Sequence, residues 1–150
     1  MLSIKKDFEY YGIVLSENSR NLILETLQEN ENFATKLSEI EKPICHHCIL
    51  LHASQLSEEN EISKQIYFNI EAMMSLKKDI KITVTHIGIS DLAMAVKVKF
   101  PKELKGICFN SVPHITIGVF NGGKPVDSNY IEHWEQIEPF NIIGKIKKHK

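Results

Sequence analysis

The chain has 150 residues, of which 43% are apolar and 25% are charged, and its formal net charge at pH 7 is −1. This length and composition are typical of one soluble globular domain, so we expect residues 1–150 to form a single domain. The balanced charge argues against a basic surface that grips long nucleic acid, although a partner with a few phosphates could bind in a local pocket.

Targeting and redox features favour a cytoplasmic location. The segment 1–9 is charged and lacks the apolar centre of a secretory signal. No apolar run approaches the ~20 residues that a membrane span needs, so we expect no membrane partner. The three cysteines, Cys45, Cys48 and Cys108, are too few for a disulfide framework. We therefore expect a reducing cytoplasm, that of a host cell if the protein is viral.

The first half of the chain predicts two strands with a helix between them. Residues 10–15 form an apolar run typical of a strand, and residues 16–19 offer N-cap candidates for a helix. Apolar residues then recur at helical spacing at Leu22, Ile23, Leu27 and Phe33. The polar segment 30–42 is expected to be irregular, and a second strand is expected over 44–52.

The segment 54–79 is compatible with two structures. Its isoleucines at 62, 66 and 70 fit one face of a helix, whereas the aromatic pair at 67–68 is equally compatible with a strand. After it, the alternation of apolar and polar residues over 80–89 and 92–100 predicts a hairpin with its turn at Ser90-Asp91.

The last part of the chain predicts two strands with a turn and a short helix between them. The expected elements are a strand over 114–120, a turn over 121–125, a short helix capped by Asp127 or Ser128 that runs to Trp134, and a strand over 140–147. The order β-α-β, hairpin, β-α-β indicates two similar halves within one α+β domain.

A histidine at 114 and a threonine at 116 begin the strand expected over 114–120. Because strand side chains alternate between faces, His114 and Thr116 point the same way while Ile115 and Ile117 point into a core. An imidazole that moves a proton beside a hydroxyl that holds an oxygen suits phosphate chemistry.

A second histidine run begins the strand expected over 44–52. If His47 is the active residue of this run, Ile49 occupies the position at which the pattern expects threonine or serine. If His46 is active instead, its partner is Cys48, whose thiol is only a weak donor. The apolar residues that follow match the His114 run better from His47.

The spacing of Cys45 and Cys48 is also that of a zinc site. The two cysteines would point to opposite faces of a strand, and no second pair of ligands follows them. A zinc-stabilised interaction module is therefore kept as an alternative of a different class, and no metal or other cofactor is expected.

These motifs resemble the 2H phosphoesterase superfamily. The resemblance lies in the repeated H-x-[ST]-apolar pattern, the first strand with its tyrosines, and the closing strand at 138–140. Within the superfamily, the run 47–51 and the stretch 129–140 are most similar to the phage anti-CBASS hydrolases. The resemblance implies a single pseudo-symmetric, bilobal α+β domain, in which antiparallel sheets line a central cleft and the helices lie outside.

The resemblance also implies roles for individual residues. His47 and His114 would be the catalytic acid/base pair and Thr116 a phosphate donor. Candidates for substrate contacts are Tyr11, Trp134 and Glu138. The implied substrate is a cyclic di- or trinucleotide immune signal, whose 3′–5′ bonds the protein would hydrolyse without a metal.

Ile49 leaves other functions open, because isoleucine cannot donate a hydrogen bond to a phosphate oxygen. The loss of one such donor can cost ~10²-fold or more in rate. The protein could therefore bind a cyclic nucleotide without cutting it, as a sponge. It could also be a 2′,3′-cyclic phosphodiesterase that acts on RNA ends.

Overall fold

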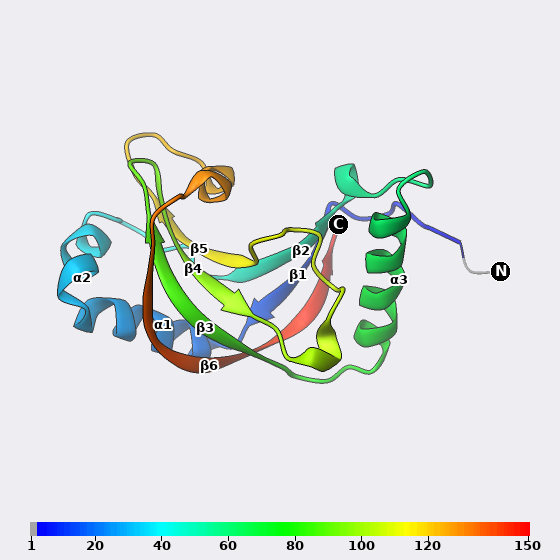
Figure 1. Ribbon diagram of the computed structural model, residues 1–150, viewed down its shortest axis with the longest axis horizontal. Coiled ribbons are helices and arrows are strands. Elements are labelled where there is room, and N and C mark those ends of the chain that lie inside the picture. Colours follow the sequence, from blue (N-terminus) through cyan, green and yellow to red (C-terminus); the bar gives the residue numbers. More distant parts are fainter. Residues whose placement is uncertain (1–2) are drawn as a thin grey trace.

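Six antiparallel strands close into a barrel in the computed structural model, which describes residues 3–150 (Figure 1). Around the barrel, the strands follow the order β1-β2-β5-β4-β3-β6. Their bounds are β1 Tyr10–Leu15, β2 His47–His52, β3 Ile80–Ile89, β4 Ala93–Lys99, β5 His114–Val119 and β6 Trp134–His149.

The expected bilobal α+β domain with a central cleft is wrong, because the six strands form one closed antiparallel barrel. β6 has 16 residues and pairs with β3 over its first part and with β1 over its last part. It thereby joins strands that the sequence assigns to separate halves. A strand over 140–147 would be too short to pair along both neighbours in this way.

An irregularity in β6 explains why its full length is not visible in the sequence. Pairing with β3 jumps from Phe140 opposite Val84 to Gln136 opposite His86. Pro139 lies inside this jump, where its missing N–H breaks no ladder hydrogen bond. The strand therefore continues through a proline that normally ends one.

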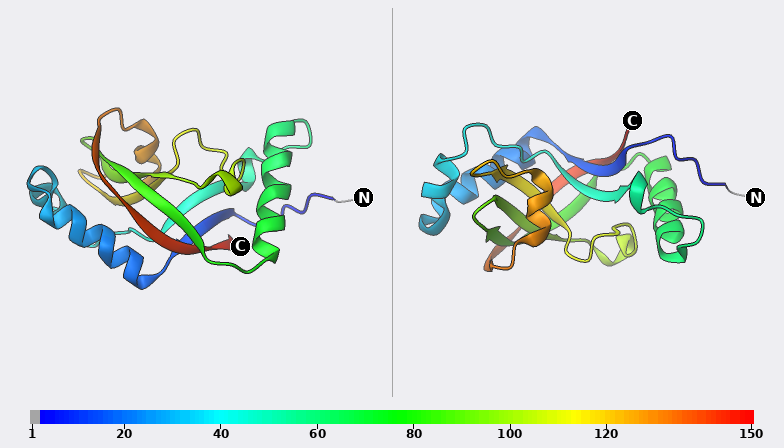
Figure 2. Two further views of the ribbon diagram at one scale, coloured as in Figure 1. Left: turned by 60° about the horizontal axis from the view of Figure 1, so that its bottom comes forward. Right: turned by 90° about the horizontal axis from the view of Figure 1, so that it is seen from above.

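Helices cover the two ends of the strands. α1 and α2 lie at one end and α3 at the other, in all views (Figures 1 and 2). Their bounds are α1 Glu17–Glu29, α2 Glu31–Ser38 and α3 Glu61–Ser75, and the 3₁₀ helices are η1 Ala53–Gln55, η2 Lys102–Leu104 and η3 Pro125–Tyr130. None of the helices described over residues 3–150 has the length and apolar character to cross a membrane.

Helix boundaries follow the capping residues. Ser16 caps α1 as expected, and its hydroxyl accepts a hydrogen bond from the Ser19 N–H. The expectation of an irregular segment over 30–42 is wrong, because Asn30 caps α2 and that helix buries Phe33 and Leu37. The ambiguous segment 54–79 contains α3. The short helix expected to end at Trp134 is η3, which ends earlier, and Trp134 begins β6.

One large apolar cluster holds the strands to the helices. Ile13, Ile82 and Ile115 from three strands, Ile23 from α1 and Ile70 from α3 are all fully buried in it. Each buried isoleucine of this kind contributes about 1.5–3 kcal/mol relative to its exposed state. The face of β2 and β5 opposite to this cluster remains free for a site.

We predict that Gly144→Ala destabilises the barrel where β6 joins β1. A Cβ at residue 144 would lie 2.6 Å from the Val14 carbonyl oxygen, a backbone atom that cannot rotate away. The expected loss in the free energy of unfolding is about 1–3 kcal/mol, measured by urea denaturation. Lys147→Ala, an exposed change on the same strand, serves as the control, with an expected change within about 0.5 kcal/mol. Equal stability of the two variants would contradict the tight approach at Gly144.

Candidate active site

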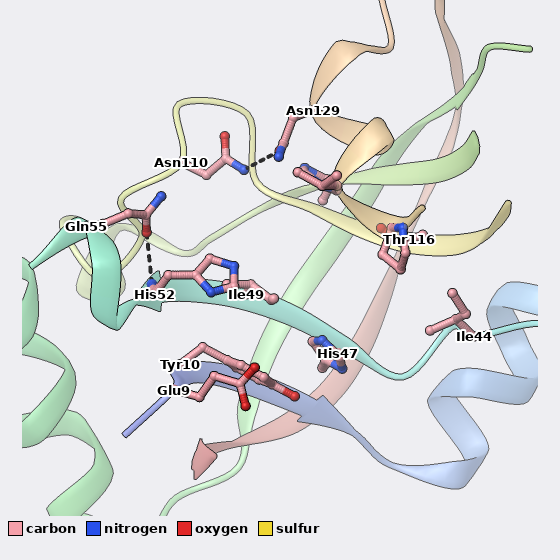
Figure 3. A pocket seen from close by; sticks show the side chains of 13 residues that line it. Glu9, Tyr10, Ile44, His47, Ile49, His52, Gln55, Asn110, Thr116 and Asn129 are labelled. Carbon is pink, nitrogen blue, oxygen red and sulfur yellow. Dashed lines mark hydrogen bonds between the residues drawn. The ribbon is translucent and has the colours of Figure 1, made fainter. Parts of the chain in front are cut away.

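A pocket of about 470 Å³ lies over β1, β2 and β5 (Figure 3). Side chains of β2 and β5 form its floor, and η3 and the loop before β5 form its upper wall. His47 and Ile49 come from β2, and His114 and Thr116 come from β5. The two histidine runs, 67 residues apart if counted from His47 to His114, therefore meet in one pocket.

The register of β2 and β5 brings these side chains opposite one another. The strands are antiparallel, with Cys48 paired to Ile115, and both side chains are fully buried. The residues on either side of this pair must therefore point to the pocket. Continuing the antiparallel register by one residue places His47 across from Thr116 and Ile49 across from His114.

The chain reaches His47 through a turn that α1 holds in place. Cys45 has a φ of 37°, in the left-handed region, just before the two histidines. Arg20 of α1 stabilises this turn, because its guanidinium donates hydrogen bonds to the carbonyls of Pro43 (2.9 Å) and Cys45 (3.1 Å). The backbone N–H of Cys45 in turn donates to the Thr116 carbonyl at 3.0 Å, which ties the turn to β5.

His114 is oriented by the backbone. Its Nδ1 lies 2.8 Å from the Val112 carbonyl oxygen, which can only accept, so Nδ1 carries a proton. The other nitrogen, Nε2, is therefore the one that gains or loses a proton. In the neutral ring Nε2 accepts a proton, and in the charged ring it donates one.

His47 belongs to a pair of adjacent histidines. Its Nδ1 lies 3.1 Å from the Nδ1 of His46, so one ring donates this hydrogen bond and the other accepts it. Burial lowers the pKa of His47 below its ordinary value of 6.5, and the charges of His46, His149 and His52 lower it further. His47 is consequently neutral at pH 7. His46 is exposed and does not line the pocket, which places His47 there instead.

Thr116 is held by a buried hydroxyl. Its Oγ1 lies 2.8 Å from the Oγ of Ser128, a fully buried residue of η3. This contact links the floor of the pocket to its upper wall. A Thr116 hydroxyl that accepts from Ser128 keeps its own proton free for an oxygen in the pocket.

A stack of aromatic rings forms one side of the pocket. The Tyr10 ring lies between His47, at 5.3 Å between ring centroids, and His149, at 4.6 Å, and is nearly parallel to both. His52 meets the same tyrosine edge-on at 5.8 Å. Stacking of this kind helps to fix the orientation of the His47 ring.

His52 reaches the pocket through a β-bulge. Tyr11 pairs with Leu51 but Gly12 pairs with Ile49, so Leu50 is an extra residue in β2. Leu50 and Leu51 are therefore both buried, and His52 returns to the face of His47. Strict alternation places His52 on the wrong face, which is why the sequence does not point to it.

Neutral polar groups supply the remaining donors. No lysine or arginine lines the pocket, and its carboxylate, Glu9, lies 3.5 Å from His149. The amide of Gln55 accepts from the His52 N–H through its oxygen, which leaves its NH₂ group free. Asn110 and Asn129 share a hydrogen bond of 3.1 Å at the opposite rim. These amides, together with Thr116, are the donors that could compensate for Ile49. Nothing in the sequence patterns points to the three amides, because Gln55, Asn110 and Asn129 lie outside the histidine strands.

The three residues expected to contact the substrate lie outside this pocket. Tyr11 is fully buried in the core against Phe8, with ring centroids 4.4 Å apart. Trp134 packs against Ile131, and the Lys97 ammonium lies 5.1 Å from its ring centroid. Glu138 is exposed on β6. The neighbour of Tyr11, Tyr10, is the tyrosine that lines the pocket.

The cysteine pair is placed in the interior. Cys45 and Cys48 are both buried free thiols. Over residues 3–150, no group of three histidine, cysteine, aspartate or glutamate side chains is placed to hold a metal ion. The described residues therefore contain no zinc site built on Cys45 and Cys48.

Comparison with known families assigns this chain to a family. The barrel with two facing histidine strands is that of a 2H phosphoesterase-like protein. Residues 2–142 match the model of the fungal tRNA ligase phosphodiesterase domain, so the chain belongs to that family. The resemblance to 2H phosphoesterases is thus confirmed at the level of the superfamily. The closer resemblance to anti-CBASS hydrolases is not shown.

A solved structure shares the fold. It is described as a fungal RNA kinase and has a TM-score of 0.61 and 19% sequence identity to this chain. The match covers 96% of this chain and 47% of the other, so the chain spans about half the length of the protein that it matches. At this identity the likeness shows the fold alone. A comparison with curated protein sequences gives no match.

We predict that His46→Ala raises the pKa of His47. The charge of His46 is one of the causes that hold this pKa below 6.5, and its removal makes the charged form of His47 less costly. Histidine ring-proton NMR over pH 4–8 measures the shift. His133→Ala, an exposed histidine that does not line the pocket, is the matched control. An unchanged titration of His47 in His46→Ala would contradict the coupling of the two rings.

Proposed function

We propose that this protein opens 2′,3′-cyclic phosphates at the ends of RNA. The observation that carries the proposal is the meeting of His47, His114 and Thr116 in one pocket. Two histidines and a hydroxyl are the groups that a phosphodiester cleavage needs for its proton transfers and its developing charge. The choice of an RNA end as substrate is supported by membership in a phosphodiesterase family of tRNA ligases.

The reaction consumes one water molecule. One histidine removes a proton from the water as its oxygen attacks phosphorus. The bond between phosphorus and one of the two ribose oxygens breaks, and the other histidine protonates that leaving oxygen. The product is a ribose with one hydroxyl and one phosphomonoester, and the two histidines have exchanged protonation states.

The surroundings of the histidines favour one assignment of these roles. His47 has a lowered pKa and is neutral at pH 7, which suits the base. Its Nδ1–H then donates to His46, so that its free nitrogen accepts the proton from water. His114, held by Val112 with Nδ1 protonated, supplies the acid through Nε2 when it is charged. Thr116 donates to a non-bridging phosphate oxygen.

We predict that His114→Ala loses ~10²–10⁴-fold in kcat on an RNA oligonucleotide with a 2′,3′-cyclic phosphate end. The assay is run in EDTA, because the pocket supplies its acid, base and oxygen donor from side chains, and products are read by mass spectrometry. His133→Ala is the control variant. No hydrolysis by the wild-type protein, or full activity of His114→Ala, would contradict the proposal.

The same assay tests cyclic di- and trinucleotides as alternative substrates. Hydrolysis of these cyclic oligonucleotides without hydrolysis of RNA ends would show that the substrate of the site is a cyclic oligonucleotide. Retention of an uncut ring after gel filtration would instead indicate a sponge.

We predict that Ile49→Thr increases kcat by about 10-fold or more. Ile49 lies across from His114, where a hydroxyl would add a donor to the phosphate, and a donor in such a site is worth ~10²-fold or more. Ile49→Val is the matched control, because valine has the shape of threonine without its hydroxyl. Equal rates for the two variants would show that another donor, such as the Gln55 amide, already holds that oxygen.

A further inference from the structure

A second groove adjoins the active site and carries positive charge. Its volume is about 360 Å³, and the segment 98–113 forms its walls. Asn110 lines both this groove and the active-site pocket, so the two are contiguous. Three lysines line it: Lys99, Lys102 and Lys105.

None of these lysines is held in an ion pair with another of the described residues, 3–150, although the exposed Glu103 lies between Lys102 and Lys105 in the chain. All three lysines are exposed. No aspartate or glutamate lines the groove. The active-site pocket has the opposite character, with no lysine or arginine and with Glu9 at its edge. Any charge attraction for a longer anion must therefore come from outside that pocket.

The groove is held in shape by contacts that do not use the lysines. Leu104 and Ile107 are buried beneath it. Asn69 of α3 donates a hydrogen bond to the Gly106 carbonyl at 3.0 Å, and the Phe109 N–H donates to the Leu50 carbonyl of β2 at 2.8 Å. Lys99 ends β4, and Lys102 and Lys105 stand on a loop whose position relative to the histidine strands is already set, which lowers the entropy cost of binding.

We propose that this groove binds the phosphates of the RNA strand on the 5′ side of the nucleotide that occupies the active site. The inference rests on the proposed function. A 2′,3′-cyclic phosphate is the 3′ end of its chain, so every further phosphate lies in the 5′ direction and must leave the pocket through an opening. Asn110 borders both the pocket and the groove, so a strand that leaves the pocket on this side meets the unpaired lysines.

The groove fits a short single strand better than a long nucleic acid. Three lysines can neutralise about three phosphates, and the chain as a whole has a net charge of −1. Three phosphate contacts to a single strand predict a slope of about −2 for log affinity against log salt. Binding would then weaken about 20-fold between 50 and 200 mM salt.

The experiment compares substrates of increasing length. Wild-type protein is assayed with a nucleoside 2′,3′-cyclic phosphate and with oligonucleotides of two to five residues that carry the same end. We expect KM to fall as 5′ phosphates are added, and the benefit to disappear with rising salt. In the triple variant Lys99→Ala/Lys102→Ala/Lys105→Ala, the ratio of kcat/KM for the pentamer to that for the mononucleotide falls to about 1.

A charge-matched control distinguishes binding in this groove from nonspecific electrostatic attraction of the RNA to the protein. Lys77, Lys78 and Lys147 line a basic pocket that shares no residue with the active site, and none of them has an ion pair within the described residues. Their triple alanine variant has the same net charge as the groove variant, and we expect it to keep the length preference of the wild type. Thermal unfolding checks that both variants fold.

The outcomes distinguish the groove from the reaction. If substrates of all lengths are hydrolysed with the same KM, or if both triple variants lose the length preference equally, the groove does not bind the 5′ phosphates. The proposed function stays intact in either case. If no length is hydrolysed, the proposed function fails. Fluorescence anisotropy then measures binding of the uncut pentamer and tests the role of the groove independently of hydrolysis. Binding that is lost only in the groove variant supports it, and equal binding by all three proteins overturns it.

Discussion

The pairing of β2 with β5 at Cys48 and Ile115 is the constraint on which the site depends. Both side chains are fully buried on the core side, so the histidines next to them in sequence must face the pocket. A slip of one residue in either strand would turn its histidine into the core. The direct pairing is short, and its register is set by the neighbours: β1 flanks β2, and β4 flanks β5 around the closed barrel.

The histidines and the unpaired lysines lie in separate places: the histidines line the pocket, and the lysines line the adjoining groove. The pocket contains histidines, amides and the hydroxyls of Tyr10 and Thr116, with no lysine or arginine among the described residues that line it. Burial, and after it the charges of the neighbouring histidines, hold the pKa of His47 below its ordinary value. A lysine at the same place would bind phosphate more strongly, but it could not exchange protons near neutral pH. The described lysines that adjoin the site line the neighbouring groove instead.

Much of the local structure could be predicted from the sequence. The hairpin of β3 and β4, the cap of α1 at Ser16 and the strands that begin at the histidines depend on alternation and capping, which are local properties. The two-lobed arrangement was wrong because the order of elements along the chain does not determine which strands pair, and all six close into one barrel. Which strands pair is decided by contacts between distant segments, and here the long β6 connects β3 to β1.

The sequence by itself determined that a histidine and a threonine share one face of β5 and that Ile49 interrupts the matching pattern in β2. These conclusions require only the two-residue period of a strand. Only the tertiary structure decided that both runs line the same pocket, and that His47 lies in it with His46 outside. It also decided that Tyr10 and His52 belong to the site. The physical reason is that the Leu50 bulge and the positive φ at Cys45 change which face a residue occupies. Contacts between distant segments hold them: β2 pairs with β1 at the bulge, and Arg20 of α1 holds the turn at Cys45.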